Sequence, residues 1–300
     1  MIQERLFDRL GLGTAQFGLS YGISNRRGCT EPDEVAAILR YGHDRGLRCL
    51  DTAPVYGNAE SVLGRTMPEG HEFLVVSKVP SGGSSPLEGV SRTLRSLGVP
   101  SLYGVLVHNA QDLLGSQEES LWCELCRCRE EGLTQKIGVS LYRPQEAEAV
   151  LERYDVDLVQ FPMNILDQRF LQNDLLGRMK RRGLELHVRS CFLQGLLLME
   201  PDEPSSYFDA VRPLLRSLRD IGQDRGLSPL AMALGFCLAV PEVDRLVVGV
   251  NGLEHLKEIG QVLSQRPERW GHGLSSFAVD DPAVVEPVYW PKEADTRHGL

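Results

Sequence analysis

The chain has 300 residues, of which 42% are hydrophobic and 24% are charged, and its formal net charge is −9. This length accommodates one large α/β domain or two small ones, and the acidic balance with scattered basic residues argues against nucleic acid or an anionic membrane as the main partner. Charges interrupt the N-terminal stretch where a signal peptide would be apolar, and no apolar run reaches the roughly 18 residues of a membrane span, so we expect a cytoplasmic protein.

Short apolar runs alternate with segments of helical periodicity along most of the chain. Strands are expected within residues 6–17 and at 47–50, 73–78, 103–108, 136–140, 156–161, 184–190 and 245–250. Helices are expected to start at residues 30 and 60 and to cover 87–97, 113–133, 144–154, 170–182, 208–224, 229–239 and 253–263. Most of the strands are apolar without alternation, which is typical of strands that are buried on both faces.

This order of elements indicates a barrel. Strand–helix alternation implies parallel pairing through right-handed crossovers, and eight such units in about 260 residues match the size of a (β/α)8 TIM barrel. A doubly wound sheet usually carries a glycine-rich turn after its first strand, but Gly11 and Gly13 lack a third glycine at the right spacing. We predict one domain over residues 1–300, in which residues 265–300 form an irregular tail packed over one barrel face.

Three of the seven cysteines, Cys123, Cys126 and Cys128, form the only cluster of thiols in the sequence. A zinc site needs a second pair of cysteines or histidines at ligand spacing, and the sequence has none. The cluster also falls in a helical pattern with Leu121 and Leu125. We therefore expect ordinary buried or half-buried thiols and no metal site.

Four ionisable side chains fall at or just after the ends of consecutive strands. Asp51 follows the second expected strand and Tyr56 lies in the loop behind it, while Lys78 ends the third strand and His108 ends the fourth. Neighbouring parallel strands lie about 4.8 Å apart, so residues at their C-terminal ends converge on one patch. In barrel enzymes, residues at these strand ends are typical of an active site.

This group of side chains has a consistent chemical meaning. A lysine ammonium near a tyrosine favours the phenolate and lowers the phenol pKa from its usual value of about 10. Asp51 would hold Lys78 by an ion pair, and Tyr56 would then donate a proton near neutral pH while His108 orients a carbonyl oxygen. No side chain carries hydride, so a nicotinamide cofactor is implied. Each residue alone is also common in a structural role, but their arrangement at successive strand ends favours function.

Four segments share the pattern of a known family. They are Asp-Thr-Ala-x-x-Tyr-Gly-x-x-Glu at residues 51–60, Ser-Lys at 77–78, His-Asn at 108–109 and the opening Leu-Gly-Leu-Gly-Thr-Ala run. This pattern, in order over about residues 9–263, resembles the aldo-keto reductase superfamily. The resemblance implies an α/β barrel that binds NADPH, or sometimes NADH, without a Rossmann domain. It also implies hydride transfer to a carbonyl carbon, with Tyr56 protonating the oxygen.

The same resemblance suggests residues for the nicotinamide end of the cofactor. Ser140 and Gln160 stand where the family binds the carboxamide, although Leu141 replaces the usual Asn. Arg189 stands at the end of the seventh strand, where family members often stack an aromatic side chain under the nicotinamide. A guanidinium plane can stack in the same way, but it also brings a charge.

Candidates for the phosphates and the adenosine follow from the last strand. Residues 249–251 lead into a helix N-terminus, which is a natural site for an anion. His255 takes the place of the arginine that usually binds the 2′-phosphate, which leaves the choice between NADPH and NADH open. The cofactor-binding candidates together are Gly13, Thr14, Ser140, Gln160, Arg189, Ser190, Leu193, Gly195, Gly249, Asn251 and His255.

Other side chains are candidates for the substrate pocket. His187 and Arg189 point to one face of their strand and could reach a charged substrate, unless one of them lines the cofactor site or pairs with a barrel carboxylate. Gln16 and Asn164 are plausible polar groups of the pocket. Two tryptophans of the tail either wall the substrate cleft or pack outside the barrel: Trp270 and Trp290.

The sequence therefore predicts an NAD(P)H-dependent reductase of a small-molecule aldehyde or ketone, with sugar-like compounds among the candidates. Two alternatives stay open. One is an enzyme that holds NAD(P) tightly and uses it transiently for epimerisation or elimination. The other is a non-catalytic, nucleotide-binding regulatory subunit. No helix shows an exposed apolar stripe that would indicate an oligomer.

Overall fold

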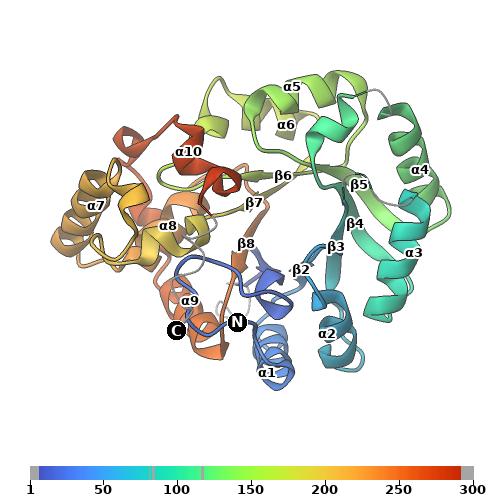
Figure 1. Ribbon diagram of the computed structural model, residues 1–300, viewed down its shortest axis with the longest axis horizontal. Helices are drawn as coiled ribbons and strands as arrows, with labels where there is room; N and C mark the ends of the chain where they lie inside the picture. The colour runs from blue at the N-terminus through green and yellow to red at the C-terminus, as the bar shows by residue number, and fades with distance from the viewer. Residues whose placement is uncertain (1–6, 81, 83–84, 116–117, 292–300) are drawn as a thin grey trace.

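The computed structural model describes residues 7–80, 82, 85–115 and 118–291. Within them, eight parallel strands pair in chain order, and β1 closes the barrel against β8. This arrangement confirms the predicted (β/α)8 barrel (Figure 1). The strands are β1 (Leu10–Gly13), β2 (Cys49–Asp51), β3 (Leu74–Val79), β4 (Leu102–Val107), β5 (Thr134–Ser140), β6 (Leu158–Pro162), β7 (Glu185–Arg189) and β8 (Arg245–Gly249).

Helices surround the barrel. In Figure 1, α1 to α6 and α9 encircle the strands, whereas α7 and α8 both belong to the connection from β7 to β8 and lie together at one side. None of the helices in the described part of the chain has the length and apolar character of a membrane-spanning segment. The helices are α1 (Pro32–His43), α2 (Ala59–Thr66), α3 (Pro86–Leu97), α4 (Glu118–Glu130), α5 (Pro144–Arg153), α6 (Leu175–Arg181), α7 (Arg212–Arg225), α8 (Pro229–Leu238), α9 (Leu253–Ser264) and α10 (Pro282–Val285).

Three helices begin later than the sequence pattern indicates. The expected helix 113–133 starts at Glu118, because the preceding segment is a separate 3-10 turn over Ala110–Leu113 whose first residues are capped by Asn109. The expected helix 170–182 starts at Leu175, because Asn173 and Asp174 have φ angles of 55° and 52° that interrupt the helical path. The expected helix 208–224 starts at Arg212, where a proline in the first turn favours initiation.

The interior of the barrel has an apolar floor. Cys49, Val76, Leu106 and Leu158 point inward from four different strands and are at most 1% exposed. A much larger apolar cluster fills the space between the strands and the helices. Polar side chains that lie above the floor, at the C-terminal end of the strands, are therefore shielded from water on their lower side.

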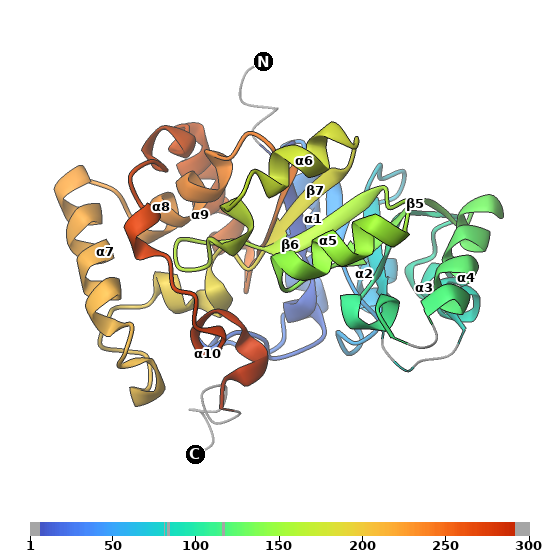
Figure 2. The same ribbon diagram turned by 90° about the horizontal axis from the view of Figure 1, so that it is seen from above.

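The tail packs near the C-terminal end of the barrel. In Figures 1 and 2, α10 lies at the front of the barrel between α7 and α5. Glu286 is 3% exposed and binds Arg143 at 3.1 Å and Arg169 at 2.6 Å, and Trp290 packs edge-on against Phe208 with ring centres 4.8 Å apart. The expected tail extends to residue 300, but residues 292–300 lie outside the described part of the chain.

Two glycines of the barrel strands provide a matched test of this packing. A Cβ atom on Gly138 of β5 would lie 1.8 Å from the carbonyl oxygen of Leu158, whereas a Cβ on Gly104 of β4 would meet only side chains at 3.5 Å or more. We expect Gly138→Ala to lower the free energy of unfolding by at least about 2 kcal/mol, because two paired strands must separate. Gly104→Ala should cost less than about 1 kcal/mol, within the range of an ordinary surface or conservative change. Urea unfolding followed by circular dichroism measures both, and equal effects would contradict the packing described here.

Candidate active site

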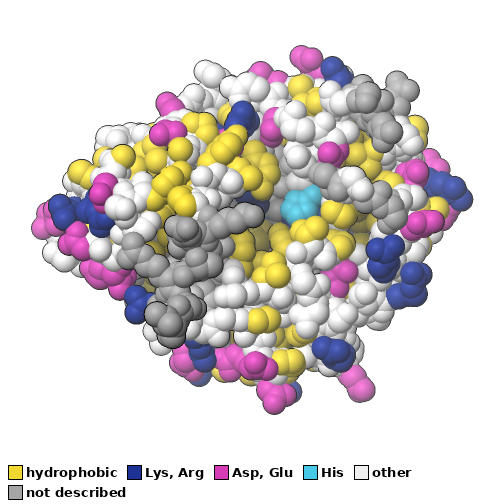
Figure 3. All heavy atoms as spheres, in the orientation of Figure 1, with side chains coloured by type: hydrophobic (Ala, Val, Ile, Leu, Met, Phe, Trp, Pro, Cys, Tyr) yellow, Lys and Arg dark blue, Asp and Glu magenta, His cyan; other side chains and the backbone are white. Residues whose placement is uncertain are grey.

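A cavity of about 830 Å³ opens at the C-terminal end of the strands. Figure 3 shows the hollow at the centre of this face, with hydrophobic side chains around it. Each of the eight strands contributes a residue at or near its C-terminal end. In strand order, these residues are Gly13, Asp51, Lys78, His108, Ser140, Gln160, Arg189 and Gly249.

A buried ion pair lies at the bottom of the cavity. Lys78 Nζ is 2.7 Å from Asp51 Oδ1, and the two side chains are 1% and 5% exposed. Lys78 also donates to the carbonyl oxygen of Thr52 at 3.1 Å, and Gln160 donates to Asp51 Oδ2 at 2.7 Å. Burial alone would lower the lysine pKa, but Asp51 and Tyr56 together raise it, so the ammonium stays charged.

Tyr56 lies directly above this pair. Tyr56 lies in a turn in which its N–H donates to the carbonyl oxygen of Ala53 at 3.0 Å. The centre of its ring is 5.3 Å from Lys78 Nζ. Burial raises the pKa of the phenol above its usual value, while Lys78 acts in the opposite direction. The sequence-based expectation of a lowered pKa is therefore wrong in its net sign, because desolvation of the phenolate outweighs the attraction of the ammonium. At neutral pH Tyr56 carries its proton.

His108 completes the group. It follows β4, its backbone N–H donates to Val79 at 3.0 Å, and its ring stands edge-on to Tyr56 with ring centres 6.3 Å apart. Burial and then the nearby Lys78 lower the imidazole pKa to about 4. The ring is consequently neutral at pH 7 and can act as a hydrogen-bond donor without adding a charge. We call the part of the cavity lined by Asp51, Tyr56, Lys78 and His108 the inner end.

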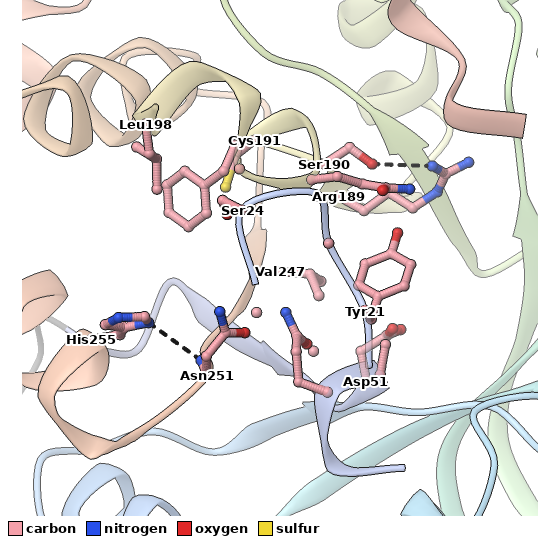
Figure 4. Close-up of a pocket in the computed structure, with 18 of the residues that line it drawn as sticks. Tyr21, Ser24, Asp51, Arg189, Ser190, Cys191, Leu198, Val247, Asn251 and His255 are labelled. Atoms are coloured by element: carbon pink, nitrogen blue, oxygen red, sulfur yellow. Dashed lines mark hydrogen bonds between the residues drawn. The ribbon is translucent and has the colours of Figure 1, made fainter. Parts of the chain in front are cut away.

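The cavity continues from the inner end toward α8 and α9. Figure 4 shows Asn251 and His255 at this far end, where the Asn251 N–H donates to His255 Nδ1 at 3.4 Å. Glu258 of α9 also lines it. The expected anion site at the N-terminus of α9 is already in contact with a carboxylate, because Leu253 N–H donates to Glu34 Oε1 at 2.8 Å. The sequence does not predict this contact, because Glu34 lies on α1, far from Leu253 in the chain.

Two loops meet across the middle of the cavity. Gly195, in the loop after β7, has a φ angle of 96°, and a Cβ atom there would lie 1.9 Å from Ser24 Oγ in the loop after β1. Only a glycine allows this approach. Both Ser24 and Gly195 line the cavity, so a ligand that extends from the inner to the far end would pass beneath or beside them.

The cavity fits a dinucleotide in several respects. Its wall includes residues from the strand ends as well as from α8 and α9. Gln160 Oε1 is buried without a hydrogen-bond partner among the described residues, which leaves an acceptor for an amide N–H. Ser140 adds a hydroxyl on the neighbouring strand. Backbone groups of the glycine-containing loop after β7 and polar side chains at the far end supply further contacts.

All of the catalytic and cofactor-binding residues predicted from the sequence line this cavity except Leu193. Leu193 is fully buried with a φ angle of 46°, so it shapes the loop and does not face the cavity. Gln16 lines the cavity, but Asn164 does not: it is fully buried and donates to the carbonyl oxygen of Ser190. The two tryptophans of the tail, Trp270 and Trp290, do not line the cavity.

His187 and Arg189 lie at different depths in the barrel. His187 is fully buried, and its Nε2 atom lies 2.9 Å from Glu185 Oε1 toward the opposite end of the strands, so it does not face the cavity. Arg189 lines the cavity, and its guanidinium carbon lies 4.2 Å above the ring centre of Tyr142. One face of the guanidinium is thus occupied by an aromatic ring of the protein.

Sequence reasoning missed several residues of the cavity wall. They come from loops and from helices that are distant in sequence, and no motif marks them. A hint existed only for Tyr142, which lies two residues after Ser140. Among the missed residues are Tyr21, Ser24, Tyr142, Phe192, Gln194, Leu198, Arg219, Ser228 and Glu258.

Comparisons with known proteins agree with this geometry. A family model described as "Aldo/keto reductase family" matches residues 9–267. Pyridoxal 4-dehydrogenase of Microbacterium luteolum is 25% identical over 83% of this chain and 87% of that protein. L-glyceraldehyde 3-phosphate reductase of Escherichia coli O157:H7 is 24% identical over 76% and 78%, respectively. The holo form of an aldo-keto reductase from Bacillus halodurans has the same fold, with a TM-score of 0.72 and 21% identity over 91% of this chain and 94% of that one.

The lowered pKa of His108 predicts a pH dependence of stability. Between about pH 6.5 and pH 4, the unfolded chain takes up a proton at this imidazole that the folded chain does not. The free energy of unfolding therefore falls as the pH drops through this window. We expect His108→Gln to reduce the loss between pH 7 and pH 5 by about 2 kcal/mol, measured by urea unfolding. His272→Gln, which removes an exposed histidine, is the control. An unchanged pH profile in His108→Gln would contradict a neutral, half-buried imidazole.

Proposed function

The chain belongs to the aldo/keto reductase family, and from this premise we propose that it uses NAD(P)H to reduce an aldehyde or ketone to an alcohol. The observation that carries the proposal is the inner end of the cavity, where Tyr56 stands above the Asp51–Lys78 ion pair and beside a neutral His108. Sugar-like carbonyl compounds remain among the candidate substrates. The similar proteins named above have pyridoxal and L-glyceraldehyde 3-phosphate in their names, and both compounds are aldehydes.

The side chains of the inner end provide proton transfer and orientation. Bound NAD(P)H supplies the hydride, which no side chain can provide. Tyr56 donates its proton to the carbonyl oxygen as negative charge develops there, and Lys78 stabilises the phenolate that remains. Asp51 keeps Lys78 in position and balances its charge in the resting protein. His108 donates a hydrogen bond that aligns the carbonyl oxygen with Tyr56.

We propose that the cofactor binds along the cavity, from the inner end to the far end. Ser140 and Gln160 would bind the carboxamide of the nicotinamide, with Gln160 Oε1 accepting an N–H. The loop that contains Ser190 and Gly195 would cover the pyrophosphate. Gly13, Thr14, Gly249, Asn251 and His255 would complete the wall toward the adenosine.

Charges at the far end bear on the choice of cofactor. The family resemblance implies NADPH, or sometimes NADH, and His255 leaves the choice between them open. A 2′-phosphate near the start of α9 would meet His255, but it would also meet the carboxylates of Glu34 and Glu258. A ribose hydroxyl, in contrast, can donate to a carboxylate, as in many NAD sites. We therefore expect NADH to bind at least as tightly as NADPH.

A second candidate function is supported by the contact between Ser24 and Gly195. Two loops that touch across the cavity would slow the exchange of a bound dinucleotide. A retained cofactor suits transient oxidation of a substrate, with the hydride returned in an epimerisation or elimination. The two functions differ in their consumption of NAD(P)H, which is stoichiometric with product only in the reductase.

The proton-donating role of Tyr56 predicts a selective loss of turnover. We expect Tyr56→Phe to lower kcat by at least about 100-fold, because a general acid contributes roughly 10²–10⁴ to the rate. The Kd for NADH should change little, since the ring stays in place. Steady-state kinetics with a generic aldehyde and fluorescence titration measure the two quantities. Tyr41→Phe, outside the cavity, is the control. Near-native turnover in Tyr56→Phe would remove Tyr56 from this role.

The cofactor preference is tested by separate fluorescence titrations with NADH and NADPH. We expect the ratio of Kd for NADPH to Kd for NADH to be at least about one in the native protein. Glu34→Gln should lower this ratio by about fivefold, because a charge near a helix N-terminus is worth up to about 1 kcal/mol. Asp33→Asn removes the neighbouring, exposed carboxylate and should leave the ratio unchanged. Binding of neither cofactor to the folded protein would refute the reductase proposal.

A further inference from the structure

Arg189 is a half-buried cation at the inner end of the cavity without an anionic partner. Its Nη2 donates to the carbonyl oxygen of Leu141 at 3.0 Å and its Nη1 to Ser190 Oγ at 3.3 Å. Both acceptors are neutral, and no carboxylate in the described part of the chain lies within ion-pair distance of the guanidinium. Such a charge is costly to hold away from water unless a ligand balances it.

We propose that Arg189 binds a carboxylate group of the substrate, so that the protein prefers carbonyl compounds that carry one negative charge. The inference deepens the proposed function and relies on it for the identity of the reacting group. It assigns to Arg189 the part of the substrate that does not react, while Tyr56 and His108 contact the carbonyl.

The balance of charge at the inner end favours one anion. Asp51 and Lys78 neutralise each other at 2.7 Å. Tyr56 keeps its proton, and His108, with a pKa of about 4, is neutral at pH 7. Arg189 is therefore the charge that remains, and its single positive charge matches a carboxylate better than a doubly charged phosphate. Its field reaches Tyr56, Lys78 and His108, where it favours the less positive form of each.

The orientation of the guanidinium also suits a carboxylate. Tyr142 covers one face at 4.2 Å, and two of the five N–H groups of an arginine have the protein acceptors named above. The remaining N–H groups lie at the edge, which is the geometry in which arginine binds carboxylates. Figure 4 shows the hydroxyl of Tyr21 directed toward the side of the cavity where Arg189 and Ser190 lie.

Several exposed side chains of the cavity wall carry no charge. Leu19, Tyr21 and Val55 line the cavity and are 37%, 38% and 48% exposed. They can contact the carbon skeleton of a small substrate, but they offer no charge to it. Recognition of a charged group therefore falls to Arg189.

The pyrophosphate of the cofactor is the other source of negative charge for Arg189. The second arginine of the cavity wall, Arg219, has partners in the protein: it lies 3.3 Å from Glu200 and donates to the carbonyl oxygen of Met199 at 2.6 Å. Arg189 lies instead close enough to Tyr56 and His108 to affect their pKa values. This position favours the substrate as the source of the anion, and the experiment separates the two sources.

The test compares matched substrates that differ by one carboxylate. The pairs are succinate semialdehyde with butanal, and 4-carboxybenzaldehyde with benzaldehyde. We expect the native protein to show a kcat/KM that is about 10- to 100-fold higher for the anionic member of at least one pair. Hydrogen bonds to a charged group contribute free energies that correspond to factors of about this size. Arg189→Met should abolish this preference, and the loss should appear mainly as a higher KM for the anionic aldehyde.

Two further variants control for charge and for stacking. Arg189→Lys keeps the charge without the planar fork and should restore part of the preference. Arg45→Met removes an arginine that also stacks on a tyrosine, at 3.7 Å from the ring centre of Tyr41, but lies outside the cavity. It should leave the preference unchanged. A neutral aldehyde that is used as well as its anionic partner in both pairs overturns the inference, while the reductase function stands.

Binding is measured separately from turnover. Calorimetric titration of the NADH-saturated protein with succinate should show binding in the native protein, its loss in Arg189→Met, and no binding of the neutral butyramide. If neither aldehyde of a pair turns over but succinate binds in this manner, the reductase proposal fails and the inference stands. If succinate does not bind, or if Arg189→Met raises only the Kd for NADH, Arg189 serves the cofactor or the fold and the inference is overturned.

Discussion

The buried ion pair between Asp51 and Lys78 is the interaction on which the site depends. Two charges at 1% and 5% exposure are stable only with close contact and with their remaining hydrogen-bonding groups satisfied. The barrel meets both conditions, because β2 and β3 are neighbours and because Gln160 and the Thr52 carbonyl bind the two groups from other directions. The apolar floor beneath the pair keeps water away from below. The pair therefore presents a fixed, charged lysine to Tyr56 without adding net charge to the cavity.

Much of this arrangement follows from the order of the strands. Asp51, Lys78 and His108 converge because parallel strands in chain order bring their C-terminal ends to one rim, and the alternation of apolar runs with helical segments already indicates that order. Ser140, Gln160 and Gly249 also lie on the cavity wall at or near strand ends, but it is the family resemblance that singles them out. The family pattern adds Tyr56, whose position in a turn could not be derived from strand geometry alone.

Other features of the site could not be predicted, because they depend on three-dimensional burial or on contacts between distant loops. The pKa of Tyr56 is raised by burial, whereas the sequence suggests only the opposing effect of Lys78. Glu34 reaches the start of α9 from α1, and Ser24 meets Gly195 across the cavity, over separations that no motif spans. Arg189 was visible in the sequence, but its partner Tyr142 and its lack of a carboxylate partner among the described residues were not.

The central claim is that hydride passes to a carbonyl carbon at the inner end while Tyr56 supplies the proton. The most direct test follows the hydrogen itself: the protein is incubated with an aldehyde and with NADH that carries deuterium in both positions at C4 of the nicotinamide, and the alcohol is analysed by mass spectrometry and proton NMR. The account predicts one deuterium atom, on the carbinol carbon, for each NADH consumed. An alcohol without deuterium, or a product that forms while NADH stays unchanged, would contradict it.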